Sequence, residues 1–162
     1  MDSFFVEKEL KKLGLKKYGK NVLISRKCSL YGSEKMEFGD NVRIDDFCIL
    51  SGHIIIGDYV HIAAYCGLFA GKHKIEFNNF STISSMCTIY ADSDDYSGKT
   101  MTNPMVPDKY KNVQGGDVVL GKHVIVGTKS TILSNVVLGE GTAVGAMSLV
   151  NQSTEPWKIY MG

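Results

Sequence analysis

The sequence predicts an all-β fold in which short parallel strands wind into a coil, a parallel β-helix. Three observations predict it: an apolar residue recurs at every sixth position over long stretches, a small or β-branched residue often stands two positions earlier, and glycine often follows the apolar residue directly. Two inward residues in every six fit strands, whose side chains alternate, and do not fit one face of an α-helix. Strands this short become stable when each pairs with the equivalent strand one coil away.

The repeat runs through most of the chain in three series. Its first column is apolar: Phe38, Ile44, Leu50, Ile56, Ile62, Leu68, Phe77, Ile83, Ile89, Leu120, Val126, Ile132, Leu138, Val144 and Val150. Its second column, two positions earlier, is small or β-branched: Val42, Cys48, Val60, Cys66, Ser81, Cys87, Val124, Ser130, Val136, Thr142 and Ser148. The glycines that follow the first column are expected to supply positive φ at the turns: Gly39, Gly57, Gly121, Gly127, Gly139 and Gly145. With three hexads per coil, the series predict two coils over 38–73, one over 77–94 and two over 120–155.

The segment before the regular coils is predicted to cover the open end of the coil. Ser3 can cap a helix that runs to about Leu13 and ends at Gly14, with an apolar stripe along one side. A less regular coil is expected over 18–37. The chain therefore divides into a helical cap at 1–20 and a β-helix domain at 21–162.

Residues 90–119 interrupt the repeat with a stretch rich in Asp, Ser and Asn that also contains Pro104 and Pro107. We expect an extruded loop here, and loops of this length inside compact domains are usually functional.

Four cysteines, Cys28, Cys48, Cys66 and Cys87, each stand two positions before an apolar residue on the same side of the coil. We expect them to stack about 4.8 Å apart and to point inward. Their spacing lacks the closely paired ligands of a metal site, so we predict buried apolar thiols and no metal. A thiol in an apolar core is disfavoured as thiolate, and none is a candidate nucleophile.

Charge and hydropathy exclude several classes of function. The 18 basic and 17 acidic residues leave a net charge of +1, which favours neither nucleic acid nor an anionic membrane surface. No stretch approaches the roughly 20 apolar residues of a membrane span, and the N-terminus has no signal-like pattern. We expect a cytoplasmic protein with a small-molecule substrate.

The repeat, as in residues 126–132, resembles that of the hexapeptide-repeat acyltransferases, which fold as a left-handed parallel β-helix. The loop residues 94–98, followed by 102–104, resemble a subgroup known as galactoside or sugar O-acetyltransferases. This resemblance implies acetyl-CoA as co-substrate, a homotrimer with active sites between subunits, and a left-handed coil. That hand opposes the usual right-handed crossover preference.

Acetyl transfer to a hydroxyl needs a base and donors for the developing oxyanion. In sugar O-acetyltransferases of this family the base is commonly a histidine at the sixth position of the hexad entering the loop, and here that position is Asp94. Three alternatives stay open: His73 pairs with Asp94 from one coil below, His61 acts from the outer face, or an amine acceptor needs no base. Residues 60–63 around His61 resemble acyltransferases that act on nucleotide-linked amino sugars. The catalytic candidates are thus His61, His73 and Asp94, although a lone surface histidine is more often solvated than catalytic.

The resemblance also implies a CoA site on the late coils, built from the backbone of Gly127, Thr128, Gly145 and Ala146 with Lys129 near phosphates. Coil turns need glycine in any case. Trp157 is a candidate to stack on adenine or to pack the tail, and relatives extend beyond Gly162 with residues that touch CoA, so part of this site is expected to be missing. The loop residues Asp95, Tyr96 and Asn103 are candidates for binding the acceptor.

The favoured hypothesis is an acetyl-CoA-dependent O-acetyltransferase acting on a sugar or sugar nucleotide in surface polysaccharide biosynthesis. The alternative is an N-acetyltransferase acting on a nucleotide-linked amino sugar, because the loop histidine is absent. A third hypothesis is a non-catalytic β-helix scaffold.

Overall fold

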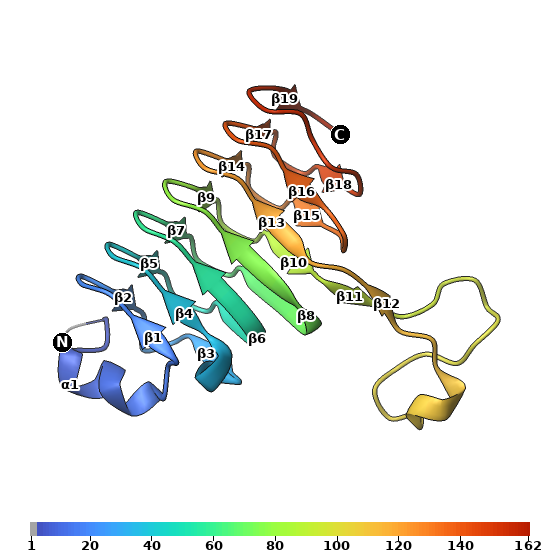
Figure 1. Cartoon of the computed structure of the whole chain (residues 1–162), viewed down its shortest axis with the longest axis horizontal. Coiled ribbons are helices and arrows are strands. Elements are labelled where there is room, and N and C mark those ends of the chain that lie inside the picture. The colour runs from blue at the N-terminus through green and yellow to red at the C-terminus, as the bar shows by residue number, and fades with distance from the viewer. Residues whose placement is uncertain (1–2) are drawn as a thin grey trace.

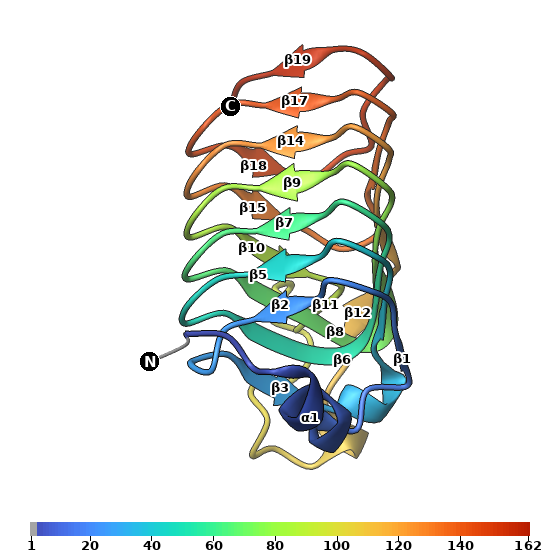
Figure 2. The same cartoon turned by 90° about the vertical axis from the view of Figure 1, so that its left-hand side faces the viewer.

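The computed structural model describes residues 3–162 and confirms the parallel β-helix (Figure 1). Strands of successive coils lie one above another and pair in parallel, and the chain winds left-handed as it rises toward the C-terminus (Figure 2). Within the described residues, one face is a seven-stranded sheet: β2 (Leu23–Ile24), β5 (Arg43–Ile44), β7 (His61–Ile62), β9 (Thr82–Ile83), β14 (Ile125–Val126), β17 (Ala143–Val144) and β19 (Ile159–Tyr160).

The other two sides of the coil form a second sheet. Its strands in residues 3–162 are β1 (Lys17–Tyr18), β3 (Ser29–Tyr31), β4 (Glu37–Phe38), β6 (Ile49–Ile56), β8 (Gly67–Phe77), β10 (Thr88–Tyr90), β13 (Val118–Leu120), β15 (Thr131–Ile132), β16 (Val137–Leu138) and β18 (Leu149–Val150). The two long strands, β6 and β8, run around the corner between these sides, which joins the sides into one sheet.

The core consists of the two columns that the sequence predicts. Every residue of both columns is buried, from Phe38 and Val42 in the first regular coil to Val150 and Ser148 in the last. Ile83 of β9 pairs in register with Val126 of β14, so the coil resumes after the loop without a shift in register.

The glycines that follow the first column do not have positive φ, which corrects the explanation given for them. Positive φ falls instead two positions later, mostly on residues with large side chains such as Tyr59, Lys129 and Met147. Gly39 and Gly127 are needed because a Cβ would meet the backbone of the next coil, at 2.8 Å from the Gly57 carbonyl carbon and 2.5 Å from the Ala146 nitrogen. The constraint is close stacking of coils and not turn conformation.

The N-terminal cap is shorter than predicted. The α1 helix covers Glu7–Leu10 and continues as a 3₁₀ turn over Lys11–Leu13, and Gly14 at φ 70° ends it. Its N-cap position is Val6 and not Ser3, because residues 4 and 5 pair with the first coil instead: Phe4 forms an antiparallel bridge with Ser25, and the Phe5 N–H donates to Ile24 O at 2.9 Å. The first coil has an open sheet edge with unpaired backbone groups. Residues 4 and 5 pair with that edge before the helix begins.

The thiols form the predicted column, with Cys48, Cys66 and Cys87 buried and Cys28 half-buried. Each Sγ donates a hydrogen bond to a carbonyl of the next coil; Cys66 Sγ, for example, lies 3.2 Å from Ser84 O. Contact with the neighbouring thiols and burial raise the pKa of Cys66. These thiols are therefore part of the core.

The loop leaves the coil through an antiparallel pair of short strands, β11 (Asp92–Ser93) and β12 (Gln114–Gly115), and projects away from the coil (Figure 1). Two 3₁₀ turns complete the structure, Ser33–Lys35 in the irregular first coil and Asp108–Tyr110 in the loop. Among the described helices, none is long and apolar enough to cross a bilayer.

Candidate active site

The predicted site residues lie in two regions. His61 and the candidate CoA residues lie along the seven-stranded sheet and the corner that follows it. His73, Asp94, Asp95, Tyr96 and Asn103 lie at the base of the loop and within it.

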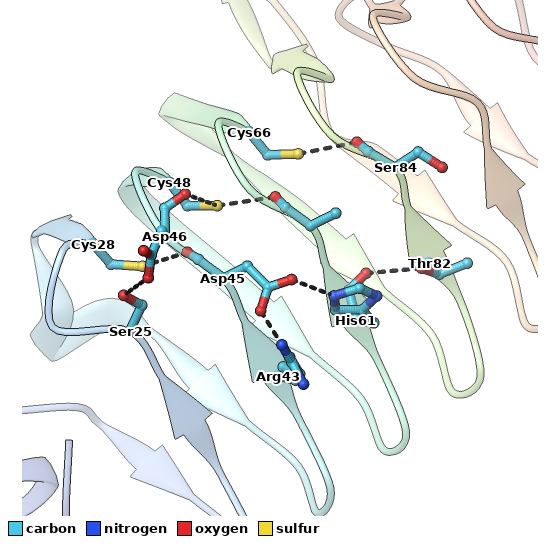
Figure 3. Close-up of polar contacts among 11 residues, drawn as sticks. Ser25, Cys28, Arg43, Asp45, Asp46, Cys48, His61, Cys66, Thr82 and Ser84 are labelled. Atoms are coloured by element: carbon cyan, nitrogen blue, oxygen red, sulfur yellow. Dashed lines mark hydrogen bonds and ion pairs between the residues drawn. The ribbon is translucent and has the colours of Figure 1, made fainter. Parts of the chain in front are cut away.

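On the outer face of the seven-stranded sheet, His61 belongs to a polar cluster (Figure 3). Its Nε2 lies 2.8 Å from Asp45 Oδ2, while Arg43 Nε donates to Asp45 Oδ1 at 2.7 Å. Partial burial opposes ionisation of Asp45, but the hydrogen bonds from His61 and Arg43 outweigh it and hold the pKa of this carboxyl below its ordinary value. Because Asp45 is only 21% exposed, it acts as a fixed anion between two donors.

Asp45 belongs to a column at the corner after this sheet, where each residue directly follows a buried first-column residue. Above Asp45, that column continues through Ala63 and Ser84 to Gly127 (Figure 3 labels Asp45 and Ser84). The Ser84 hydroxyl makes no hydrogen bond within residues 3–162. Arg43, Asp45 and Ser84 were not among the predicted site residues. For Asp45 and Ser84 the available signal was a polar residue at a position that glycine or alanine occupies in other coils.

The same corner carries backbone amides of the late coils, and only some of the predicted ones are available. The N–H groups of Gly127, Lys129 and Gly145 donate to carbonyls of Val144, Ser85 and Tyr160. Within the described chain, the N–H groups of Thr128 and Ala146 make no hydrogen bond. The coil ladder therefore already uses the N–H groups of Gly127 and Gly145, which leaves Thr128 and Ala146 as the available amide donors of the predicted set. The CoA site at this corner stays a prediction.

Trp157 lies on a different corner. Its ring stacks toward His123 with centroids 6.1 Å apart, in a column with Phe80 and Tyr59, and fills the space above Gly141 where a side chain would collide. Packing of the tail is the role this position supports.

At the base of the loop, His73 pairs with Asp92 and not with Asp94. His73 Nδ1 is hydrogen-bonded to Asp92 Oδ1, and the Lys72 N–H donates to Asp92 Oδ2 at 2.8 Å. The prediction of a His73–Asp94 pair is wrong because β8 bulges here: Phe69 faces Ser51 while Lys74 already faces His53. The extra residues shift His73 toward the β11 strand.

Asp94 lies on the rim of an open cavity of about 640 Å³, which is lined by Tyr90, Asp92, Ser93, Asp94, Tyr96, Thr131, Leu133 and Ser134. The Asn103 N–H donates to Asp94 Oδ2 at 3.2 Å, and Oδ1 has no hydrogen-bond partner in the described residues. One carboxylate oxygen therefore remains available to a ligand in the cavity.

The other loop candidates differ in availability. Asp95 accepts hydrogen bonds from the Ser97 N–H (2.8 Å) and Thr100 Oγ1 (3.2 Å), and Ser97 is the main cause of its lowered pKa. Asn103 caps its own turn through the Met105 N–H at 2.9 Å. Tyr96 is 93% exposed and lines the cavity. Tyr96 is thus available for binding, whereas Asp95 and Asn103 mainly fix the loop.

The two regions are far apart in one protomer. Ser84 lies at the corner before β10, and Asp94 lies beyond the corner after β10. One side of the coil separates them, about 15–20 Å at the rise of a β-strand.

Comparisons with known proteins identify the relatives of this chain. Residues 36–70 match the family described as bacterial transferase hexapeptide (six repeats). Over 163 aligned residues the chain is 44% identical to the dTDP-4-amino-4,6-dideoxy-D-glucose acyltransferase of Escherichia coli, covering 99% of this chain and 84% of that protein. It is 54% identical to AntD, an N-acyltransferase from Bacillus cereus, in complex with dTDP and 3-hydroxybutyryl-CoA, with a TM-score of 0.98 and coverage of 100% and 86%. A variant of AntD in which Ser84 is replaced by alanine, in complex with dTDP-4-amino-4,6-dideoxyglucose and coenzyme A, matches at 53% identity, the same TM-score, and coverage of 100% and 87%.

Proposed function

This chain belongs to the hexapeptide-repeat acyltransferases, and from that premise we propose that it transfers an acyl group from an acyl-CoA to the amine of a dTDP-linked 4-amino-4,6-dideoxy sugar. The observation that carries the proposal is the 44% identity over nearly the whole chain to an acyltransferase named for that substrate. The chain is an acyltransferase and not a scaffold. These relatives support N-acylation, the alternative hypothesis from the sequence, better than the favoured hypothesis of O-acetylation.

The absence of a histidine at the loop entrance fits an amine acceptor. A neutral amine attacks a thioester carbonyl through its own lone pair. A hydroxyl is a weaker nucleophile and needs a base that removes its proton as it attacks. The nitrogen–carbon bond forms as the carbon–sulfur bond breaks, the nitrogen gives up a proton, and the departing thiolate takes one up. The base therefore need not be a histidine.

We assign Asp94 and Ser84 to the acceptor amine and the reacting thioester. AntD has been crystallised with substitutions at its positions 84 and 94, serine and aspartate, and this chain carries the same residue types at the same numbers. Asp94 Oδ1 is free to accept a hydrogen bond from an ammonium or amine, and the Ser84 hydroxyl is free to donate to an oxyanion. Because these residues lie on different sides of one protomer, the proposal places each active site between two copies of the chain, as in the homotrimer that the family resemblance implies.

The acyl-CoA is proposed to lie along the corner above Ser84. The two free amides there, of Thr128 and Ala146, stand on successive coils, so they can donate to two carbonyl groups along an extended chain. The Lys129 side chain is exposed at the same corner and remains a candidate for phosphates.

The test is an acceptor comparison with purified protein. dTDP-4-amino-4,6-dideoxyglucose and dTDP-6-deoxyglucose, which carries a hydroxyl at C-4, are each incubated with acetyl-CoA and with 3-hydroxybutyryl-CoA. Thiol release and the product mass are measured. We expect turnover of the amine only; turnover of the hydroxyl sugar without the amine would reverse the assignment to O-acylation.

A further inference from the structure

Arg43, Asp45 and His61 form a donor cluster on the outer face of the seven-stranded sheet (Figure 3). Arg43 of β5 and His61 of β7 are register partners on neighbouring coils, and Asp45 bonds to both through its two oxygens. The Phe4 ring lies 5.2 Å from the guanidinium carbon of Arg43 and supports it from another side. Three contacts thus hold the two nitrogen-bearing side chains in one orientation.

The cluster presents donors outward. In the described residues, Nη1 and Nη2 of Arg43 and Nδ1 of His61 have no hydrogen-bond partner. Both oxygens of Asp45 point at donors of the cluster, and the charge of Arg43 offsets the charge of this carboxylate. Lys27, at the same corner one coil below, is already paired with Asp46 at 2.8 Å. A rigid guanidinium fork beside an imidazole suits a phosphate group better than it suits a neutral ligand.

The position of the cluster fits one part of the proposed acceptor. Asp45 lies two coils below Ser84 in the same column, roughly 10 Å away at the spacing of paired strands. Only the small side chain of Ala63 lies between them in that column. This span is comparable with the distance from the C-4 amine of a hexose to a diphosphate on its C-1.

The direction also fits. The free amides of Thr128 and Ala146 lie on the C-terminal side of Ser84, and this is the side proposed for acyl-CoA. An acceptor that meets the thioester at Ser84 must extend the opposite way, toward the coils of Ala63, His61 and Arg43.

We propose that Arg43 and His61, oriented by Asp45, bind the diphosphate of the nucleotide-linked sugar. This inference rests on the proposed function, because it needs an acceptor amine at Ser84. The ligand class is a nucleoside diphosphate sugar, and the cluster recognises its phosphates and not its base.

Calorimetry with dTDP and, separately, with coenzyme A tests the site on the full chain. Arg43→Gln should weaken dTDP binding about 10- to 100-fold, the range for losing hydrogen bonds to a charged group, and should leave coenzyme A binding within about twofold. Arg43→Lys keeps the charge and the aliphatic stem over Phe4, so it should fall between wild type and Arg43→Gln. Lys122→Gln removes a positive charge at another corner and should bind dTDP like wild type. Thermal unfolding of each variant checks folding.

The outcomes separate this inference from the proposed function. If the wild-type protein acylates the amino sugar and Arg43→Gln binds dTDP as tightly as wild type does, only the diphosphate site is overturned. Weakened coenzyme A binding with unchanged dTDP binding would overturn it as well, since the cluster would then serve the other co-substrate. Absence of both dTDP binding and turnover in wild type would overturn both proposals.

Discussion

Asp45 is the residue in the proposed acceptor region whose ionisation depends most clearly on its neighbours. Burial alone would favour the neutral acid, yet His61 and Arg43 lower its pKa from the ordinary 3.8. A carboxyl with a lowered folded-state pKa stabilises the fold at pH values above its unfolded pKa, and this contribution is lost as the pH falls through the folded-state pKa. Asp45 should therefore contribute to stability at neutral pH and not in strong acid.

The lowered pKa of Asp45 predicts how Asp45→Asn changes stability with pH. Its free energy of unfolding should be lower than that of wild type by a constant amount from pH 7 to pH 5, and the difference should shrink below about pH 4. Urea unfolding at pH 7, 5, 4 and 3 measures it. Glu140→Gln is the control, because its carboxylate makes no ion pair in the described chain. A difference that persists undiminished at pH 3 would show that Asp45 acts through packing and not through charge.

Asp94 is predicted to act on the reaction itself. Asp94→Asn keeps the size and the acceptor for the Asn103 N–H but removes the charge and the basicity, so kcat should fall by about 10²–10⁴, the usual contribution of a general acid or base. Steady-state kinetics should show little change in the KM for acyl-CoA. Asp117→Asn removes an exposed charge beside Lys74 and should retain activity. If the kcat of Asp94→Asn equals that of wild type, Asp94 has no role in the reaction.

At the scale of elements, the sequence predicted which residues point inward but not how the turns and bulges redirect side chains. The period of six appears in the sequence because buried positions tolerate few residue types, so Phe38, Ile44 and Cys48 could be placed from their spacing. His73 could not be paired correctly, because the β8 bulge adds residues that no spacing rule counts. Its catalytic role stays a prediction, and its contact with Asp92 favours a role in fixing the loop strand that leads to Asp94.

The column of thiols gives an element-scale prediction. Cys48, Cys66 and Cys87 are buried and hydrogen-bonded to carbonyls of the next coil, whereas Cys28 is half-buried at the irregular first coil. In the folded protein, iodoacetamide should modify Cys28 slowly and leave the other three unmodified, because buried thiols ionise poorly. Peptide mass mapping before and after urea unfolding measures this. Rapid modification of Cys66 in the folded protein would mean that the coil opens locally.

At the scale of the whole molecule, the fold was predictable and the composition of the site was not. A solenoid is specified coil by coil, so local spacing suffices to predict it. An active site shared between copies depends on which surfaces meet, and a repeat carries no information about that. Asp94 was found because it interrupts a familiar pattern, whereas Ser84 lies a full side of the coil away and has no local feature that marks it as part of the same site.

Subunit mixing tests whether that distance is bridged by a second copy. Ser84→Ala and Asp94→Ala should each be nearly inactive alone. If each site takes Ser84 from one protomer and Asp94 from its neighbour in a closed ring, random reassembly of the two variants in equal amounts leaves about one site in four with both native residues. Mixing after mild denaturation and refolding should therefore restore about a quarter of wild-type activity, because half of the protomers supply each residue. Refolding each variant alone is the control. If one protomer supplied both residues, no mixture would recover activity, and the site between copies would have to be abandoned even if the acceptor assignment stood.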